Sequence, residues 1–72
     1  MEIEMILKKA RENAGYTQEQ VAERIRVSRQ TISNWETGKT LPDIISIIDL
    51  SDLYQISIDE LLKGDKSLKQ RT

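Results

Sequence analysis

Residues 17–38 read TQEQVAERIRVSRQTISNWETG, and this segment is the most informative part of the sequence about the fold. Thr17 can cap a helix, and Gln20, three positions later, completes a capping box, a pair of reciprocal hydrogen bonds at the start of a helix. Apolar residues then recur at helical spacing until the helix ends near Arg26. The stretch therefore begins with a short amphipathic helix.

A second short helix follows after about three residues. Ser28 is a good N-cap, Ile32 and Trp35 lie three positions apart on one face, and Gly38 ends the helix. Two short helices joined by such a turn form the helix-turn-helix geometry, in which the second helix stands out from the domain. We expect Trp35 to pack in the core rather than to stack on bases.

One further helix precedes this stretch. Its buried stripe runs from Ile3 to Ala14, and Gly15 ends it as a left-handed cap. Strand signals are almost absent, because the β-branched residues fall at helical spacings. The sequence predicts an all-α fold, a compact five-helix bundle that contains a helix-turn-helix.

Two helices are predicted after the stretch. Asp43 opens the fourth helix, with its charge at the positive end of the helix dipole. Ser57 caps the last helix, residues 58–63, and Gly64 stops it. The buried side of the fourth helix is expected to carry Ile44, Ile47, Ile48 and Ser51.

Length and composition set further bounds. The chain has 72 residues, a net charge of −1 and neither Cys nor His. We expect one domain over residues 1–64 and a polar tail over residues 65–72. Disulfides and thiolate metal sites are excluded, and no apolar run is long enough to span a membrane. The N-terminus lacks the features of a secretion signal, so a cytoplasmic protein is expected.

Acidic pairs are the residues that come closest to a catalytic pattern. They are Glu19 with Glu23 and Asp49 with Asp52. Without His or Cys, and in so small a chain, ordinary solvated helix faces explain them better. We expect no enzymatic activity, no cofactor and no metal site.

The polar face of the second helix of the pair is the candidate binding surface. With Ile32 and Trp35 inward, the other side carries Arg29, Gln30, Ser33 and Asn34, with Thr31 at the edge. Arg can make a bidentate contact to guanine, and Gln or Asn to adenine. A solvated helix face is the plain alternative.

Phosphate contacts need other donors. Gln18 lies beside the free N–H groups at a helix N-terminus, which favours an anion. Lys39 and Thr40, just past the second helix, can reach the DNA backbone from the other side. Such contacts fix register without reading sequence.

The chain resembles the Cro/phage-repressor (XRE-type) helix-turn-helix family. The resemblance is carried by GYTQEQVA at 15–22, VSRQTISNWE at 27–36, GK at 38–39, LPD at 41–43 and ISIDELL at 56–62. It covers roughly residues 4–64, including the spacing between these blocks. The sequence departs from the family at Gln55, where Gly is usual. A left-handed conformation there would cost Gln some energy.

The resemblance implies a five-helix domain that binds operator DNA as a dimer, with residues 29–37 in the major groove. It places Arg11 in a salt bridge with Glu36. The expected base contacts are Arg29, Gln30, Thr31, Ser33 and Asn34. The expected phosphate contacts are Gln18, Ser28, Thr37, Lys39 and Thr40.

A homodimer needs a surface, and apolar residues off the predicted core stripe are its candidates. The expected dimer contacts are Ile45, Leu50, Ile58 and Leu61. The predicted function is a sequence-specific transcriptional regulator, most simply a repressor on a near-palindromic site. Two alternatives remain open: an antitoxin that represses its own operon while holding a toxin, and a protein-interaction module that has lost DNA binding.

Overall fold

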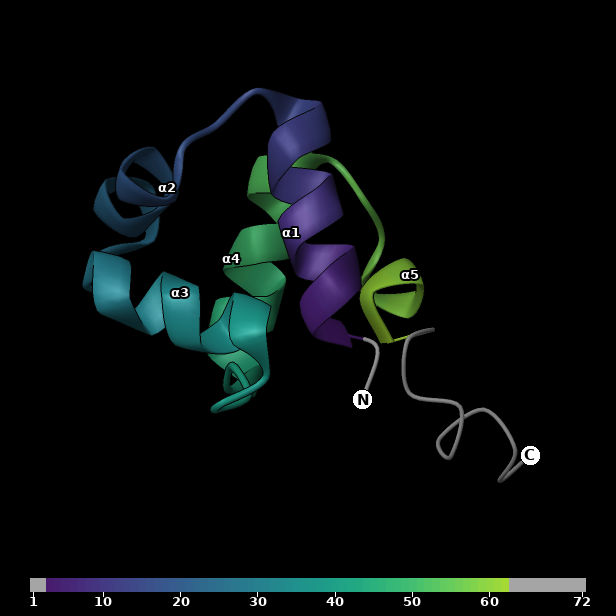
Figure 1. Ribbon diagram of the computed structural model, residues 1–72. Helices are drawn as coiled ribbons and strands as arrows, with labels where there is room; N and C mark the ends of the chain where they lie inside the picture. Colours follow the sequence, from purple (N-terminus) through teal and green to yellow (C-terminus); the bar gives the residue numbers. More distant parts are fainter. Residues whose placement is uncertain (1–2, 63–72) are drawn as a thin grey trace.

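Five α-helices follow one another along residues 3–62, the part of the chain that the computed structural model describes (Figure 1). This confirms the predicted all-α, five-helix fold. None of the described helices is long and apolar enough to cross a bilayer. The predicted helix end at residues 63–64 and the tail at 65–72 lie outside the described residues. The helices are α1 (Ile3–Ala14), α2 (Gln18–Ile25), α3 (Arg29–Thr37), α4 (Ile44–Tyr54) and α5 (Ile58–Leu62).

Side-chain caps define where α2 and α3 begin. The backbone N–H of Gln20 donates to Thr17 Oγ1 at 3.1 Å, and the backbone N–H of Thr17 donates to Gln20 Oε1 at 2.9 Å. The predicted capping box is therefore formed. At α3, the backbone N–H of Thr31 donates to Ser28 Oγ at 3.1 Å. Each cap satisfies N–H groups that the helix itself leaves unpaired.

Left-handed residues end four of the helices. Gly15 and Gly38 have φ of +82° and +80°, as glycine allows. Arg26 and Gln55 adopt the same region with φ of 63° and 59°. The family's glycine position is thus left-handed here too, and Gln55 Nε2 donates to the Asp52 carbonyl at 2.9 Å. The left-handed Arg26 was not predicted from the sequence.

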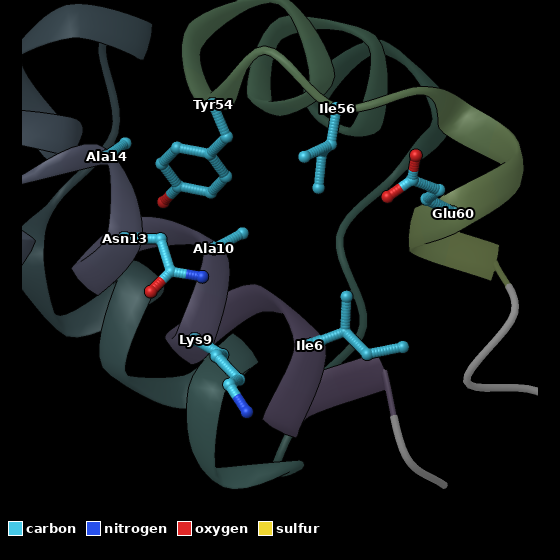
Figure 2. Close-up of a pocket in the computed structure, with 8 residues that line it drawn as sticks. All are labelled: Ile6, Lys9, Ala10, Asn13, Ala14, Tyr54, Ile56 and Glu60. Atoms are coloured by element: carbon cyan, nitrogen blue, oxygen red, sulfur yellow. The ribbon is translucent and has the colours of Figure 1, made fainter.

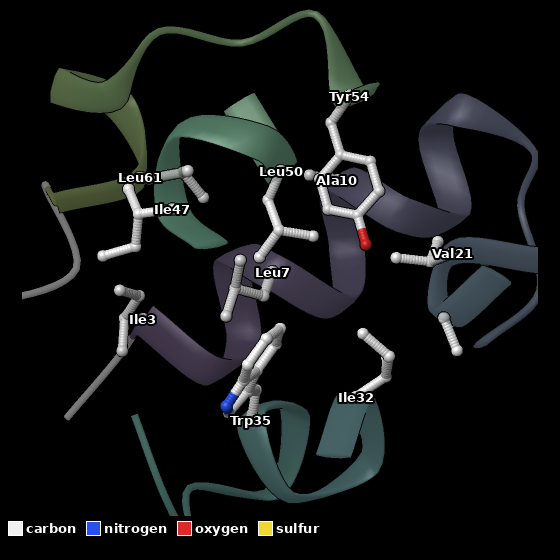
Figure 3. Close-up of a cluster of buried hydrophobic side chains, with 11 residues drawn as sticks. Ile3, Leu7, Ala10, Val21, Ile32, Trp35, Ile47, Leu50, Tyr54 and Leu61 are labelled. Carbon is white, nitrogen blue, oxygen red and sulfur yellow. The ribbon is translucent and has the colours of Figure 1, made fainter. Parts of the chain in front are cut away.

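The core lies between α1 and the other helices (Figure 3). α1 contacts α3, α4 and α5, and its stripe of Ile3, Leu7 and Ala10 is buried. Ile32 and Trp35 point inward from α3, so the predicted core role of Trp35 is confirmed. This packing fixes which face of α3 is left for solvent.

The predicted inward face of α4 is partly wrong. Ile47 is buried, but Ile44 and Ile48 are exposed, and Leu50 is buried with 2% exposure. The segment IISIIDLSDLY is apolar around much of its circumference, so its spacing alone does not select a face. Packing against α1 and α5 determines which face of α4 is buried.

The observed burial of side chains on α4 and α5 corrects two of the predicted dimer contacts. Leu50 is in the core, and Leu61 of α5 is 0% exposed, so neither offers surface to a second copy. Ile58 is half-buried against the core. Of the four residues, Ile45 alone is largely exposed.

Asp43 is expected to stabilise α4 in a pH-dependent way. Its carboxylate accepts from the backbone N–H of Ser46 at 3.1 Å, and hydrogen bonds from Ser46 lower the pKa of Asp43. Because the folded pKa is depressed, this stabilisation is present above the unfolded pKa of about 3.9. It is lost as the pH falls through the lowered folded value. Thermal melts of wild type and Asp43→Ala should therefore differ most near neutral pH and converge in strong acid; a constant difference would contradict this.

Candidate nucleic-acid interface

α2 and α3 form the helix-turn-helix pair at one side of the molecule, away from α5 (Figure 1). Residues 26–28 make the turn, and the backbone N–H of Val27 donates to the Ala22 carbonyl at 3.0 Å. α3 rests on both α1 and α2. Its outer face is thereby presented on a rigid support, as a helix that enters a groove requires.

The outer face of α3 carries the predicted base-reading residues. Arg29 and Gln30 are exposed, whereas Thr31, Ser33 and Asn34 are half-buried. Gln30 Nε2 donates to Asn34 Oδ1 at 3.0 Å, one turn along the helix. Thr31 Oγ1 lies 2.9 Å from Ser28 Oγ and belongs to the cap. The structure therefore pairs Gln30 with Asn34 and Thr31 with Ser28.

An ion pair joins α1 to the end of α3. Arg11 Nε donates to Glu36 Oε2 at 2.8 Å and Arg11 Nη2 to Glu36 Oε1 at 3.1 Å, while Arg11 Nη1 donates to the Tyr16 carbonyl at 2.8 Å. The side chains are only 11% and 3% exposed. The hydrogen bond to Glu36 raises the pKa of Arg11. Such a bidentate pair fixes helix orientation as well as charge.

Gln18 extends this pair to the binding face. Its Nε2 donates to Glu36 Oε1 at 3.1 Å, and its Oε1 accepts from Arg29 Nη1 at 3.3 Å. A continuous chain therefore runs from Arg11 through Glu36 and Gln18 to Arg29. We call these four residues the Arg11–Arg29 network. Sequence reasoning treated the salt bridge, the phosphate contact and the base contact separately and missed this link.

The Arg11–Arg29 network limits the number of N–H groups that the Gln18 side chain can donate to a phosphate. An amide nitrogen carries two N–H groups, and one of them is directed at Glu36. The other, together with the N–H groups at the start of α2, suits an anion. Gln18 can thus contact a phosphate without leaving the network.

The other predicted phosphate contacts flank α3. Ser28 is the N-cap. Thr37 Oγ1 donates to the Ser33 carbonyl at 2.9 Å, so its hydroxyl proton is already used. Lys39 and Thr40 are exposed, and their backbone N–H groups donate to the Asn34 carbonyl at 2.9 and 3.4 Å. Among the described residues, Lys39 is an exposed cation at this end of the face.

A separate hollow of about 390 Å³ lies between α1 and the α4–α5 end of the domain (Figure 2). None of its described lining residues belongs to α2 or α3. Burial raises the pKa of Tyr54, and the described residues contain no group of acidic side chains that could hold a metal ion. The lining of the hollow is mostly apolar. Its lining residues are Ile6, Lys9, Ala10, Asn13, Ala14, Tyr54, Ile56 and Glu60.

Comparison with known proteins gives the same architecture. Residues 7–61 match the family model described as Helix-turn-helix. The HTH-type transcriptional activator BcrR of Enterococcus faecalis is 42% identical over 66 residues, covering 92% of this chain and 32% of that protein. The HTH-type transcriptional regulator ImmR of Bacillus subtilis is 41% identical over 64 residues, covering 89% of this chain and 50% of that protein.

A third relative has a repressor's name. The cryptic phage CTXphi transcriptional repressor RstR of Vibrio cholerae is 34% identical over 61 residues, covering 85% of this chain and 54% of that protein. The chain thus spans about a third to a half of the length of these relatives. The family match and the observed helix pair agree: the chain belongs to the XRE-type helix-turn-helix family.

Proposed function

We propose that this protein is a DNA-binding transcriptional regulator that places α3 in the major groove of double-stranded DNA. The observation that carries the proposal is the outer face of α3, where Arg29 is held by Gln18 and Gln30 by Asn34. Both are side chains that read base edges. A merely solvated face does not need its polar groups fixed in this way.

The charge distribution supports the same orientation. The net charge is −1, so the protein is not a polycation that coats nucleic acid. Near the proposed interface, Arg29 and Lys39 lie at the two ends of α3, and Glu36 is neutralised by Arg11. A phosphate backbone thus meets cations and amide donors there, and the carboxylate of Glu36 is already paired with Arg11.

We propose that two copies bind a near-palindromic site, with their α3 helices about 34–36 Å apart. Occupying a promoter represses transcription without any further contact, whereas activation needs a surface for polymerase. Repression is therefore the simpler proposal. We also propose that the protein acts in the cytoplasm, where its DNA is. In vitro transcription from the gene's own promoter tests it: output should fall as protein is added, and a rise would overturn repression.

A gel shift tests DNA binding itself. The probe is DNA from upstream of the protein's own gene, the competitor is random DNA, and the measurement is made at two salt concentrations. Specific binding should survive the competitor and weaken as salt rises, because phosphate contacts release counterions. No shift at low salt would overturn the proposal.

Lys39→Ala is expected to weaken binding to every DNA by the same factor. Lys39 is proposed to contact phosphate, so its loss should lower the slope of log K against log salt by about one. Lys9→Ala is the matched control, because Lys9 lies at the hollow on the other side of α1. The two variants should be titrated on specific and random DNA. A selective loss on specific DNA would argue for base reading by Lys39.

The hollow favours one second candidate, a protein-interaction module that has lost DNA binding. An apolar hollow with Lys9 and Glu60 at its lining fits a partner's side chain. The gel shift separates the two functions. A chain that binds no DNA but binds the product of a neighbouring gene would support the second.

A further inference from the structure

Apolar side chains form the middle of the hollow between α1 and the α4–α5 end of the domain (Figure 2). α1 contributes Ile6 and Ala10, and the facing wall is formed by Tyr54 at the end of α4 and by Ile56. Ile6 and Ile56 pack against the core but are only half-buried, so part of each is left open. The volume of about 390 Å³ lies within the range of roughly 300–1,000 Å³ that ligand sites have. The hollow can therefore take a bulky apolar side chain.

Tyr54 adds an unused polar group to this lining. The residue is 5% exposed, and its hydroxyl forms no hydrogen bond with another described residue. Among the described residues, no side-chain oxygen or nitrogen that is closed off from water lacks a partner, so this hydroxyl has access to open space. In Figure 2 it points from α4 toward α1. Because buried hydroxyls are nearly always hydrogen-bonded, a ligand that pairs with this one is favoured.

Two opposite charges lie on opposite sides of the apolar lining. Lys9 belongs to α1 and Glu60 to α5, and both are exposed (Figure 2). Neither side chain forms a hydrogen bond or an ion pair with another described residue. Complementary charges select a partner and fix its direction more than they add affinity. The hollow therefore favours an occupant with an acidic group at one end and a basic group at the other.

An extended peptide segment has this pattern of groups. In an extended chain the side chains of residues i−2, i and i+2 point to the same side, and the outer two are about 13 Å apart along the chain. An apolar residue at i can enter the hollow while the outer residues reach Lys9 and Glu60. A free amino acid carries both of its charges on one carbon and cannot place them on opposite sides. The backbone of a segment can also pair with the Tyr54 hydroxyl.

We infer that the hollow binds a short extended segment of a partner protein, in which a bulky apolar residue lies two positions from an acidic residue and two positions from a basic one. The inference rests on the interaction role that the hollow favours and names the chemistry of the partner, but it does not require a loss of DNA binding. None of the described lining residues belongs to α2 or α3. The chain can thus hold the partner and DNA at the same time.

Peptide titration of the 72-residue chain, followed by the NMR signals of its backbone amides, is the first test. The probes are acetyl-Glu-Ser-Leu-Ser-Lys-amide and the same peptide with Glu and Lys exchanged. One of them should bind with a dissociation constant of about 1 mM and shift the signals of Ala10 and Ile56, but not those of α3. Serine in place of leucine should weaken binding at least about tenfold. No shift with either peptide at about ten times that concentration overturns the inference.

Exchanging the two charges of the protein is the second test. Lys9→Glu combined with Glu60→Lys should reverse the preference between the two peptides. The preference is expected to be about two- to fivefold in each direction, because exposed ion pairs are weak. Lys8→Glu is the matched control, since Lys8 is exposed on α1 and does not line the hollow. An unchanged preference in the exchanged variant, or a reversal in the control, contradicts the pairing.

Tyr54→Phe is the third test, because it removes the hydroxyl alone. The hydroxyl has no hydrogen bond to lose, so the urea midpoint of the free protein should not fall. The affinity for the preferred peptide should fall about fivefold. Lower affinity at equal stability identifies a contact with the ligand. Unchanged affinity excludes that contact.

Two other occupants are distinguished by the same titration. Residues 65–72 contain one apolar residue, Leu68. Removing these residues should leave the peptide affinity unchanged, whereas a gain of about tenfold or more would show that they fill the hollow and would overturn a foreign partner. The peptide dissociation constant should also be independent of protein concentration. A dependence on protein concentration would assign the hollow to a second copy.

The titrations contain no DNA, so they separate this inference from the proposed DNA binding. If the gel shift fails but the peptide binds as described, only the proposed DNA binding is wrong. If the gel shift succeeds but neither peptide binds, only the inference about the hollow is wrong. With both in place, saturating peptide should leave the gel shift unchanged. Loss of the shift would contradict simultaneous binding.

Discussion

Replacing Arg11 with methionine is expected to lower the free energy of unfolding by about 3–5 kcal/mol, because it leaves a buried carboxylate without its cation. Glu36 is 3% exposed in its side chain and accepts two hydrogen bonds from Arg11. Methionine keeps much of the length and the apolar stem of arginine but supplies no donor. The free energy of unfolding of a small domain is about 5–15 kcal/mol in all, so the expected loss is a large part of its stability. Urea unfolding followed by circular dichroism measures it.

A double variant separates the unpaired charge from lost packing. Arg11→Met combined with Glu36→Met removes both ions, and replacing a buried ion pair by apolar residues of similar size is often neutral. The double variant should therefore recover most of the stability that the single variant loses. If single and double variants unfold at the same urea concentration, packing around Arg11 is the cause instead.

DNA binding should not recover in the double variant. Glu36 also accepts from Gln18, which in turn accepts from Arg29. Without Glu36, both side chains lose their fixed orientation, and specific affinity should fall at least about tenfold, or about 1.4 kcal/mol. Normal affinity in the stable double variant would show that the Arg11–Arg29 network serves only folding.

The local signals in this sequence were sufficient to predict the helix pair. Thr17 with Gln20 and Ser28 with Thr31 are contacts over three residues, so their geometry depends on little beyond the segment itself. Since these caps fix where α2 and α3 begin, the inward direction of Ile32 and Trp35 follows from the 3.6-residue period. The face proposed to read DNA was therefore predictable.

The sequence predicted less where the outcome depends on packing between distant segments. α4 is apolar around most of its surface, so the face that turns inward is chosen by α1 and α5, and Leu50 was misplaced. The link from Glu36 to Gln18 spans 18 residues and depends on how α2 meets α3. No spacing rule within one helix contains that information.

Gln30→Ala is expected to relax sequence preference, not to weaken binding to all DNA alike. In the free protein Gln30 gives one amide N–H to Asn34 Oδ1. Its second N–H and its Oε1 remain, and adenine offers an acceptor at N7 and a donor at N6. We propose that the pairing with Asn34 orients Gln30 for a bidentate contact to adenine.

The expected loss is about 1–3 kcal/mol of discrimination, or roughly 5- to 150-fold, between the preferred site and one with guanine for adenine. Competition gel shifts with the two sites measure it, and Lys39→Ala is the control that should weaken both sites alike. Asn34→Ala should also reduce discrimination, because it removes both the partner that orients Gln30 and a side chain that is itself expected to contact a base. An equal loss on both sites for Gln30→Ala would assign Gln30 to the phosphate backbone and move base reading to the neighbouring Arg29.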